Sequence, residues 1–454
     1  MKKRTKTIIL TITFIQLAII AALTILPPLA RALPGEYRVR IAHYALGDAL
    51  LDIGATPLPT ALPAPNRAIT PVRITIPAIT AVTPTPQPTE TPQPTVEIEA
   101  ELETAVTPFP TTEPTNTPEP TAAATAMPLP PQARIDGLEI IAQGFNNCGP
   151  ANLTINLTFY GDTTTQETAA AFLKPNREDR NVSPWQIVDY VNEQSTMRAF
   201  IGSGGTLELL KRLIANGFPV VIEKGYELPS EGWLGHYLTL FAYDDAQQEM
   251  LSMDTNLGPW DNSGRVDSYE DIEYYWQQFN YTFYVVYPPS QEQIVYDLLG
   301  EEMLDTAVMW QNAAEIAQAD IDQNPENAFA WFNLGSSLTR LGEMTGEAAF
   351  YENGANAFDQ ARVLGIPPRI VWYQFRPYIA YMKVGRYQDM LDLAEATLAT
   401  QGGQNVEETY LYKGHALAFT GNGAGAVEAY QEALRLNENF YPAQWALDAI
   451  VGNG

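Results

Sequence analysis

The residue in this chain best suited to covalent chemistry is its one cysteine, Cys148, which stands in the run Gln-Gly-Phe-Asn-Asn-Cys-Gly-Pro. A lone thiol forms neither an internal disulfide nor a thiolate zinc site, so it is a buried structural residue, a lipidated anchor or a nucleophile. Pro150 follows two positions later, and proline is favoured in the first turn of a helix. We therefore expect Cys148 at a helix N-terminus, where aligned peptide dipoles lower the pKa of a thiol and favour a nucleophile.

A nucleophilic thiol needs a base, and the chain contains three histidines: His43, His236 and His415. His43 follows an N-terminal apolar segment, and His415 lies in a region of helical repeats. His236 shares a predicted globular region with Cys148, at the start of a strand that β-branched and aromatic residues predict over residues 235–243. His236 is therefore the expected base.

The imidazole also needs an orienting group, and the next predicted strand, residues 249–255, supplies a candidate. Asp254 lies at its end, where it can accept a hydrogen bond from His236 and fix the imidazole tautomer. Asn256 and Asp244 are competing orienters.

These features resemble the bacteriocin-processing, double-glycine-leader class of papain-like cysteine peptidases, in particular its free-standing branch. The resemblance covers about residues 137–287 and is carried by Gln143, residues 147–151, 159–161 and 235–237, Asp254 and Gly258. It implies an α+β papain-like fold with Cys148 as nucleophile, His236 as general base and acid, and Asp254 as orienter. It also implies an oxyanion hole formed by Gln143 and the backbone N–H of Cys148.

Such a protein is expected to be a cysteine peptidase that hydrolyses peptide bonds by acyl transfer. Two other functions remain open. One is a surface scaffold or binding protein whose catalytic residues are inactive. The other is an amidase or transpeptidase that acts on cell-wall peptides through the same triad.

Trp185 has two interpretations. Its helical spacing with Val188 and Val191 favours a place in the core. The alternative is that Trp185 lines the substrate cleft.

The first 31 residues predict a cytoplasmic tail and a transmembrane anchor. Basic residues at positions 2–4 and 6 precede an uncharged apolar run over residues 8–30. About 20 such residues span a bilayer as a helix, and the basic cluster places the tail in the cytoplasm and the rest of the chain outside. A signal peptide cleaved near residues 30–32 is the alternative, which would give a secreted protein. Residues 32–54 form a juxtamembrane segment.

Residues 55–132 are dominated by proline and threonine. Such a stretch buries too little apolar surface to fold, and its prolines favour an extended polyproline conformation. We expect a disordered stalk, with a reach of roughly 200 Å, that holds a catalytic domain of residues 133–289 away from the membrane.

Residues 290–454 predict helices in an approximate repeat. The patterns Trp331-x-x-Leu334-Gly335 and Tyr410-x-x-x-Gly414 resemble tetratricopeptide repeats, in which small residues allow close packing of helices. An all-α solenoid of this type presents a concave surface to a substrate or a protein partner. A helical spacer that binds nothing is the alternative.

The charge of the chain narrows the range of partners. It has 26 basic and 53 acidic residues and a net charge of −27, so repulsion opposes binding to nucleic acid. The single cysteine and the scattered histidines form no cluster for a soft metal, and we expect no cofactor. The expected partners are a peptide or protein substrate, a protein on the helical repeats, and the membrane.

Overall fold

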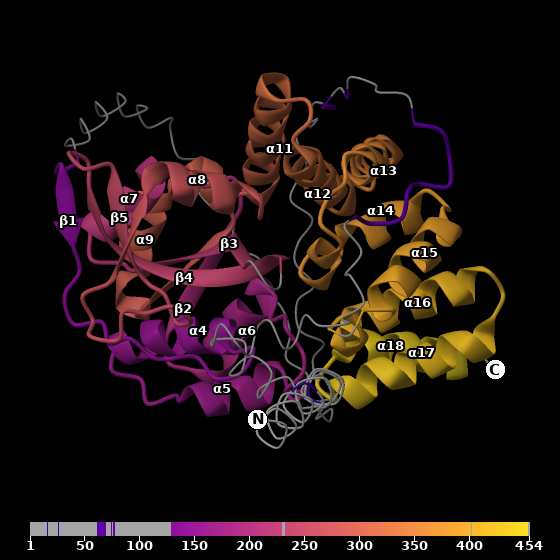
Figure 1. Cartoon of the computed structure of the whole chain (residues 1–454), viewed down its shortest axis with the longest axis horizontal. Coiled ribbons are helices and arrows are strands. Elements are labelled where there is room, and N and C mark those ends of the chain that lie inside the picture. The colour runs from indigo at the N-terminus through magenta and orange to yellow at the C-terminus, as the bar shows by residue number, and fades with distance from the viewer. Residues whose placement is uncertain are drawn as a thin grey trace, which may run out of the picture. The chain divides into compact units, whose positions relative to one another are not determined.

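A seven-stranded antiparallel sheet occupies the middle of the chain in the computed structural model (Figure 1). The structure describes residues 129–228, 232–400 and 402–452, together with 61–69, 74, 76–77, 16 and 26. The predicted membrane anchor, apart from residues 16 and 26, and the juxtamembrane segment lie outside the described residues. Within the described residues, no helix has both the length and the apolar character needed to cross a bilayer.

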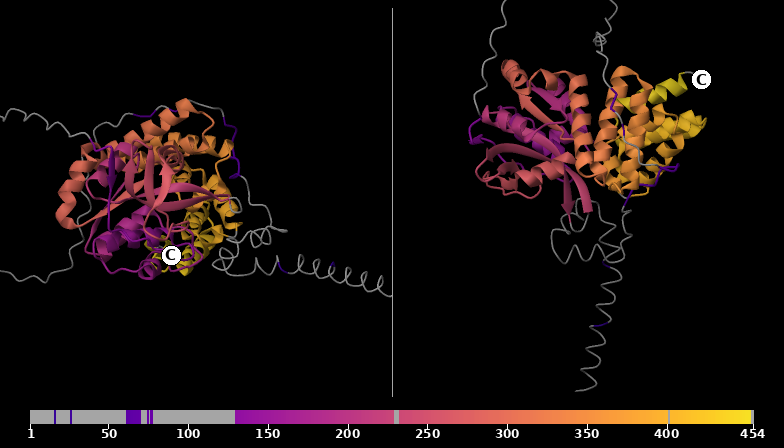
Figure 2. Two further views of the ribbon diagram at one scale, coloured as in Figure 1. Left: turned by 60° about the vertical axis from the view of Figure 1, so that its left-hand side comes forward. Right: turned by 90° about the horizontal axis from the view of Figure 1, so that it is seen from above.

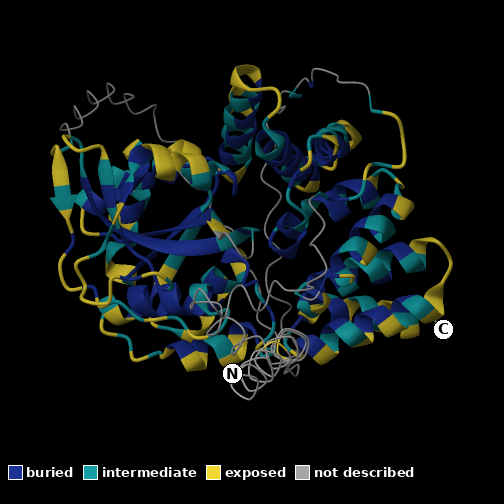
Figure 3. Cartoon of the chain, in the orientation of Figure 1, coloured by how far each residue is buried: buried dark blue, intermediate teal, exposed yellow. Residues whose placement is uncertain are grey.

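The strands run in the order β2-β7-β3-β4-β5-β6, and β1 pairs with the end of β4 beyond β3. Their bounds are β1 Gln132–Arg134, β2 Arg198–Gly202, β3 Val220–Leu228, β4 Gly232–Asp244, β5 Glu249–Met253, β6 Arg265–Ser268 and β7 Phe283–Tyr287. The predicted strands at 235–243 and 249–255 correspond to β4 and β5, so both predictions are confirmed. The long central β4 has buried residues along most of its length (Figure 3).

Helices cover both faces of the sheet because its central strands alternate apolar side chains between the faces. Val221, Tyr237 and Tyr284 pack against α4 Cys148–Phe159, α5 Gln166–Leu173 and α6 Pro184–Gln194. The neighbouring residues Val220, Leu238 and Phe283 pack on the opposite side with α7 Leu207–Ala215, α8 Tyr269–Gln277 and α9 Glu292–Leu299. This arrangement of an antiparallel sheet and flanking helices is the α+β architecture that was expected.

The remainder of the chain is helical, as predicted, and belongs to the same compact unit as the sheet (Figure 2). Its helices are α10 Glu301–Leu304, α11 Thr306–Gln323, α12 Ala328–Thr345, α13 Ala348–Val363, α14 Arg376–Lys383, α15 Tyr387–Leu398, α16 Glu407–Phe419, α17 Gly423–Leu436 and α18 Tyr441–Val451. Short 3₁₀ helices lie at Pro289–Gln291, Pro368–Trp372 and Gly403–Asn405.

Glycines bring these helices close together. A Cβ atom at Gly335 would lie 2.8 Å from the ring of Phe358, and one at Gly414 would collide with the ring of Tyr430. These contacts join α12 to α13 and α16 to α17, and they explain why the repeat pattern places glycine opposite an aromatic residue. The tetratricopeptide assignment itself stays a prediction.

Part of the proline-rich stretch is docked on the helices. The guanidinium of Arg362 in α13 donates to the carbonyl oxygens of Pro63 and Ala64, at 2.8 and 3.0 Å. Leu62 is buried, and the backbone N–H of Asn66 donates to Asp389 in α15. The prediction of a disordered stalk is therefore wrong for residues 61–69, because a buried arginine supplies the donors that their carbonyl groups need.

Candidate active site

Helix α4 begins at Cys148, as the Gly-Pro sequence after it predicts. The residue is half-buried, and its thiol is free. Gly149 allows the helix to approach β4 closely, since a Cβ atom at this position would lie 3.3 Å from Val182 and 3.5 Å from the ring of Tyr237. The first turn of α4 therefore holds the thiol against the sheet with the helix dipole behind it.

Two buried asparagines, one and two turns after Cys148, fasten α4 to β4. Asn152 Nδ2 donates to the carbonyl of Cys148 at 2.9 Å and to that of Tyr237 at 3.0 Å. Asn152 Oδ1 accepts from the hydroxyl of Thr239 at 2.8 Å, and Asn156 Nδ2 donates to that same hydroxyl at 2.9 Å. Buried amides of this kind fix the register between the helix and the strand.

His236 and Asp254 meet beside this helix end. His236 lies opposite Lys224 in the β3–β4 ladder, and Asp254 directly follows β5. The Nε2 atom of His236 lies 3.2 Å from Asp254 Oδ1, and both side chains are buried. The imidazole and the thiol of Cys148 line the same small hollow, close enough for each group to shift the pKa of the other. Since Nε2 faces the carboxylate, Nδ1 is the nitrogen available to the thiol.

The three side chains shift one another's pKa values. Burial opposes ionisation of Cys148, but the hydrogen bond and charge of His236 outweigh it and lower the pKa of the thiol. Burial also opposes protonation of His236, yet Asp254 and Cys148 raise the pKa of the imidazole to about 9. Burial would raise the pKa of the Asp254 carboxyl, but His236 and the N–H groups of Asn256 and Leu257 hold it below its usual range. Together these shifts favour a thiolate beside an imidazolium.

The other candidates for the group that orients His236 have different partners. Asn256 donates its side-chain amide to the hydroxyl of Tyr226, and Asp244 caps the turn after β4. His415 pairs with the hydroxyl of Tyr430 in the helical region. His43 lies outside the described residues.

Gln143 lies next to the same loop as Asp254. Its Oε1 accepts a hydrogen bond of 2.8 Å from the hydroxyl of Thr255, and its backbone N–H donates to the carbonyl of Thr255. The oxygen of the amide is therefore held by Thr255, which directs the NH₂ group away from that residue. These contacts tie Gln143 to the loop that carries Asp254.

Residues that sequence reasoning missed surround the thiol. Glu223 in β3 is buried opposite Tyr237, and burial and the charge of Cys148 raise the pKa of its carboxyl well above the usual value. Asn152 and Thr255 were also missed. A signal for Asn152 exists in the spacing of Cys148, Asn152 and Asn156, which places the three residues on one face of α4.

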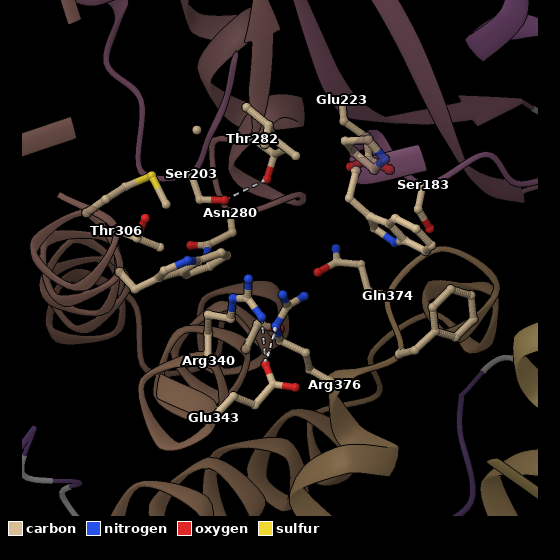
Figure 4. Close-up of a pocket in the computed structure, with 18 of the residues that line it drawn as sticks. Ser183, Ser203, Glu223, Asn280, Thr282, Thr306, Arg340, Glu343, Gln374 and Arg376 are labelled. Atoms are coloured by element: carbon tan, nitrogen blue, oxygen red, sulfur yellow. Dashed lines mark hydrogen bonds and ion pairs between the residues drawn. The ribbon is translucent and has the colours of Figure 1, made fainter. Parts of the chain in front are cut away.

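The hollow around Cys148 is small, about 10 Å³, and it opens beside a larger cavity of about 570 Å³ (Figure 4). Trp185 lines the larger cavity and is 47% exposed. The interpretation of Trp185 as a core residue is therefore wrong, since its face of α6 is turned to a cavity. Among the described residues, no group of three or more His, Cys, Asp or Glu side chains is arranged to hold a metal ion.

A comparison with protein families gives a match over the region that contains this site. Residues 126–284 match the model of the Peptidase_C39 like family. A solved structure from Bacillus anthracis, described as a candidate C39-like peptidase, is 16% identical and covers 34% of this chain and 96% of its own, with a TM-score of 0.28. No curated protein sequence matches the chain. The family match supports a papain-like domain of the C39 type and suggests a cysteine peptidase. The bacteriocin-processing assignment stays a prediction.

Proposed function

We propose that this protein is a cysteine peptidase that cleaves peptide bonds with Cys148, His236 and Asp254. The observation that carries the proposal is that Cys148 and His236 line one small hollow while the imidazole is paired with the buried carboxylate of Asp254 at 3.2 Å. This is the relationship of nucleophile, base and orienter that activates a weak nucleophile.

In the proposed reaction, His236 Nδ1 holds the proton of Cys148, and the thiolate attacks the carbonyl carbon of the peptide. The imidazolium then gives that proton to the departing amine, which leaves a thioester on Cys148. Water hydrolyses the thioester with His236 as the base, and the free thiol returns. Asp254 keeps the imidazole in the tautomer that presents Nδ1 to the sulfur.

The oxyanion that forms during attack needs donors, and we assign the side-chain NH₂ of Gln143 and the backbone N–H of Cys148 to this role. Two features support the assignment. The oxygen of the Gln143 amide is already held by Thr255. The backbone N–H of Cys148 lies at the start of α4, where helix N–H groups have no partner within the helix.

An electrophilic thiol probe and a quenched-fluorescence peptide library test the proposal together. We expect labelling at Cys148 and cleavage by the wild type, neither in Cys148→Ala, and strongly slowed labelling in His236→Ala. The matched control is His415→Gln, which changes a histidine in the helical region and should retain both activities. Equal peptide cleavage by the wild type and Cys148→Ala would refute the proposal. Cleavage of cell-wall fragments alone would instead favour an amidase.

We further propose that the apolar run at residues 8–30 anchors the protein and that its peptidase and helical parts lie outside the cytoplasm. The basic residues before the run support this orientation. The helical region is proposed to select substrates or partners. Membrane fractionation and protease accessibility of intact cells test the location, and a tryptic peptide from residues before position 8 in the mature protein would exclude a cleaved signal.

A further inference from the structure

A cavity of about 570 Å³ lies between the sheet-containing part and the helical region (Figure 4). Its volume falls within the range of about 300–1,000 Å³ that is typical of ligand pockets. Trp185 and Thr282 line it from the sheet side, while Trp310, Arg340 and Tyr412 line it from α11, α12 and α16. Hydrogen bonds join the two walls, among them one of 2.9 Å from Asn280 to Ser337.

The cavity adjoins the hollow at Cys148. Glu223 and Tyr373 line both, and Val182 of the hollow is followed directly by Ser183 of the cavity. A peptide whose scissile bond lies at the thiol therefore has an adjoining space for its neighbouring residues.

Two arginines on different helices share one carboxylate in this cavity. Arg340 donates to Glu343 Oε2 at 3.3 Å, and the Nε atom of Arg376 lies 4.0 Å from the same oxygen. Both Nε atoms are buried and have no hydrogen-bond partner among the described residues. Figure 4 shows the two guanidinium groups side by side above Glu343, facing the open space. One carboxylate cannot satisfy the donors of two guanidinium groups.

The charge balance of the cavity differs from that of the chain. Among the described residues that line it, Arg340 and Arg376 are basic, and Glu223 and Glu343 are acidic. Burial and the charge of Cys148 raise the pKa of Glu223 well above its usual value, which favours its neutral form. With Glu223 in that form, Glu343 is the one carboxylate left opposite the two arginines among the described residues of this lining, in a protein of net charge −27.

One aromatic ring holds one of these cations in place. The guanidinium of Arg376 lies 5.1 Å from the ring centroid of Trp310. A stacked guanidinium is oriented before a ligand arrives, so less freedom is lost when it binds an anion.

We propose that Arg340 and Arg376 bind a carboxylate of the peptide substrate close to the scissile bond, so that the cavity selects acidic peptides. This inference rests on the proposed peptidase function, which it extends by naming the substrate class. The carboxylate belongs either to an Asp or Glu side chain or to the free C-terminus of a short peptide. Both present the planar pair of oxygens that arginine binds through paired N–H donors.

The test is a binding selection that needs no catalysis. Full-length Cys148→Ala protein is incubated with a random pentapeptide library, made once with free and once with amidated C-termini, and bound peptides are identified by mass spectrometry. We expect enrichment of carboxylate-bearing peptides over their Asn, Gln or amidated counterparts by about tenfold or more, the scale of a charge-assisted hydrogen bond. Enrichment of Asp and Glu in the amidated library would show that the site binds a side-chain carboxylate. Enrichment confined to peptides with free C-termini would show that it binds the terminal carboxylate.

Further substitutions in the Cys148→Ala protein test whether the two arginines, rather than the overall charge of the protein, cause the enrichment. Arg340→Gln with Arg376→Gln should abolish the enrichment, and Arg340→Lys with Arg376→Lys should keep part of it. Arg435→Gln removes an exposed arginine of α17 and should change nothing. Thermal melting shows whether each variant is folded. If the double substitution to glutamine is unfolded, the double substitution to lysine provides the comparison.

Equal binding of acidic peptides and their amide counterparts overturns the inference. Enrichment that persists when both arginines are replaced by glutamine in a folded protein also overturns it. So does loss of enrichment when both are replaced by lysine in a folded protein. These results leave the peptidase proposal intact if the wild type still cleaves peptides and reacts with the thiol probe. Conversely, selection of acidic peptides by a wild type that neither cleaves nor labels would refute the peptidase proposal and leave a binding site for carboxylates.

Discussion

The hydroxyl of Thr255 donates a hydrogen bond of 2.8 Å to Oε1 of Gln143. The backbone of the two residues is joined as well, by a hydrogen bond of 2.8 Å from the Gln143 N–H to the Thr255 carbonyl. Since Thr255 directly follows Asp254, one loop after β5 positions both the carboxylate that faces His236 and the proposed oxyanion donor. Support of this kind from a neighbouring residue is what holds a catalytic group in a single orientation.

Substitution of Gln143 tests this link. We expect Gln143→Ala to lower kcat by about 10²–10³, the usual cost of an oxyanion donor, while the labelling rate of Cys148 changes little. Thr255→Val should lower kcat by a smaller factor, since the amide remains but loses its anchor. Thr255→Ser keeps the hydroxyl and serves as the control. Steady-state kinetics measure these effects, and a wild-type kcat in Gln143→Ala would remove Gln143 from the oxyanion hole.

The pKa shifts predict the pH dependence of kcat/KM. The rate should rise as the thiol ionises, at a pH below the usual thiol range because the pKa of Cys148 is lowered. It should fall near pH 9, where His236 loses the proton that the leaving amine needs. Asp254→Asn removes the negative charge that raises the pKa of the imidazole, so the alkaline limb should move to lower pH.

Asp244→Asn is the matched control for this profile because Asp244 lies at the far end of β4 and caps a turn. Its alkaline limb should coincide with that of the wild type. An alkaline limb that stays in place in Asp254→Asn would show that Asp254 does not set the protonation of His236.

Removal of Asn152 should affect stability. Asn152→Ala leaves the carbonyl of Tyr237 and the hydroxyl of Thr239 without this partner, and a buried polar group that loses its partner costs about 1–3 kcal/mol. Urea unfolding measures the change in the free energy of unfolding. Asn216→Ala, at an exposed position after α7, should change it by less than about 0.5 kcal/mol. An equal effect of both changes would argue against the role of Asn152 as the link between α4 and β4.

Local patterns were sufficient for several parts of this structure. The Gly-Pro sequence after Cys148 indicates where α4 begins, and the composition around His236 indicates β4. The pairing of Asn152 with Tyr237 was out of reach, because the two are 85 residues apart and either partner alone is an ordinary polar or aromatic residue. Contacts of this kind depend on the tertiary fold and leave no local trace.

The error at Trp185 has a related cause. Helical periodicity shows that a helix has an apolar face but not whether that face meets the core or a cavity. The cavity exists because α11, α12, α14 and α16 pack beside the sheet. Arg340 and Arg376 come together for the same reason, since they lie on separate helices.

The docked segment of residues 61–69 can be tested by proteolysis. Leu62→Asn places a polar amide where an apolar side chain is buried, so the segment should detach and trypsin should cleave after Arg67 faster than in the wild type. Arg67 is otherwise engaged by an ion pair with Asp359 of 2.8 Å. Ala68→Asn makes the same change at an exposed position and should leave the cleavage rate as it is. Equal rates in all three proteins would contradict a docked segment.

Fastening residues 61–69 to α13 and α15 shortens the length of chain that would separate the proposed membrane anchor from the folded part of the protein. About 30 residues separate the end of the predicted bilayer segment, near residue 31, from the docked segment at residue 61. A polypeptide spans at most about 3.3–3.6 Å per residue. In the proposed anchored protein, the docked segment therefore lies no more than about 110 Å from the membrane. In the proposed anchored protein, detachment of residues 61–69 would extend the connecting chain to residue 132, about threefold in contour length, and would let the proposed peptidase reach more distant substrates.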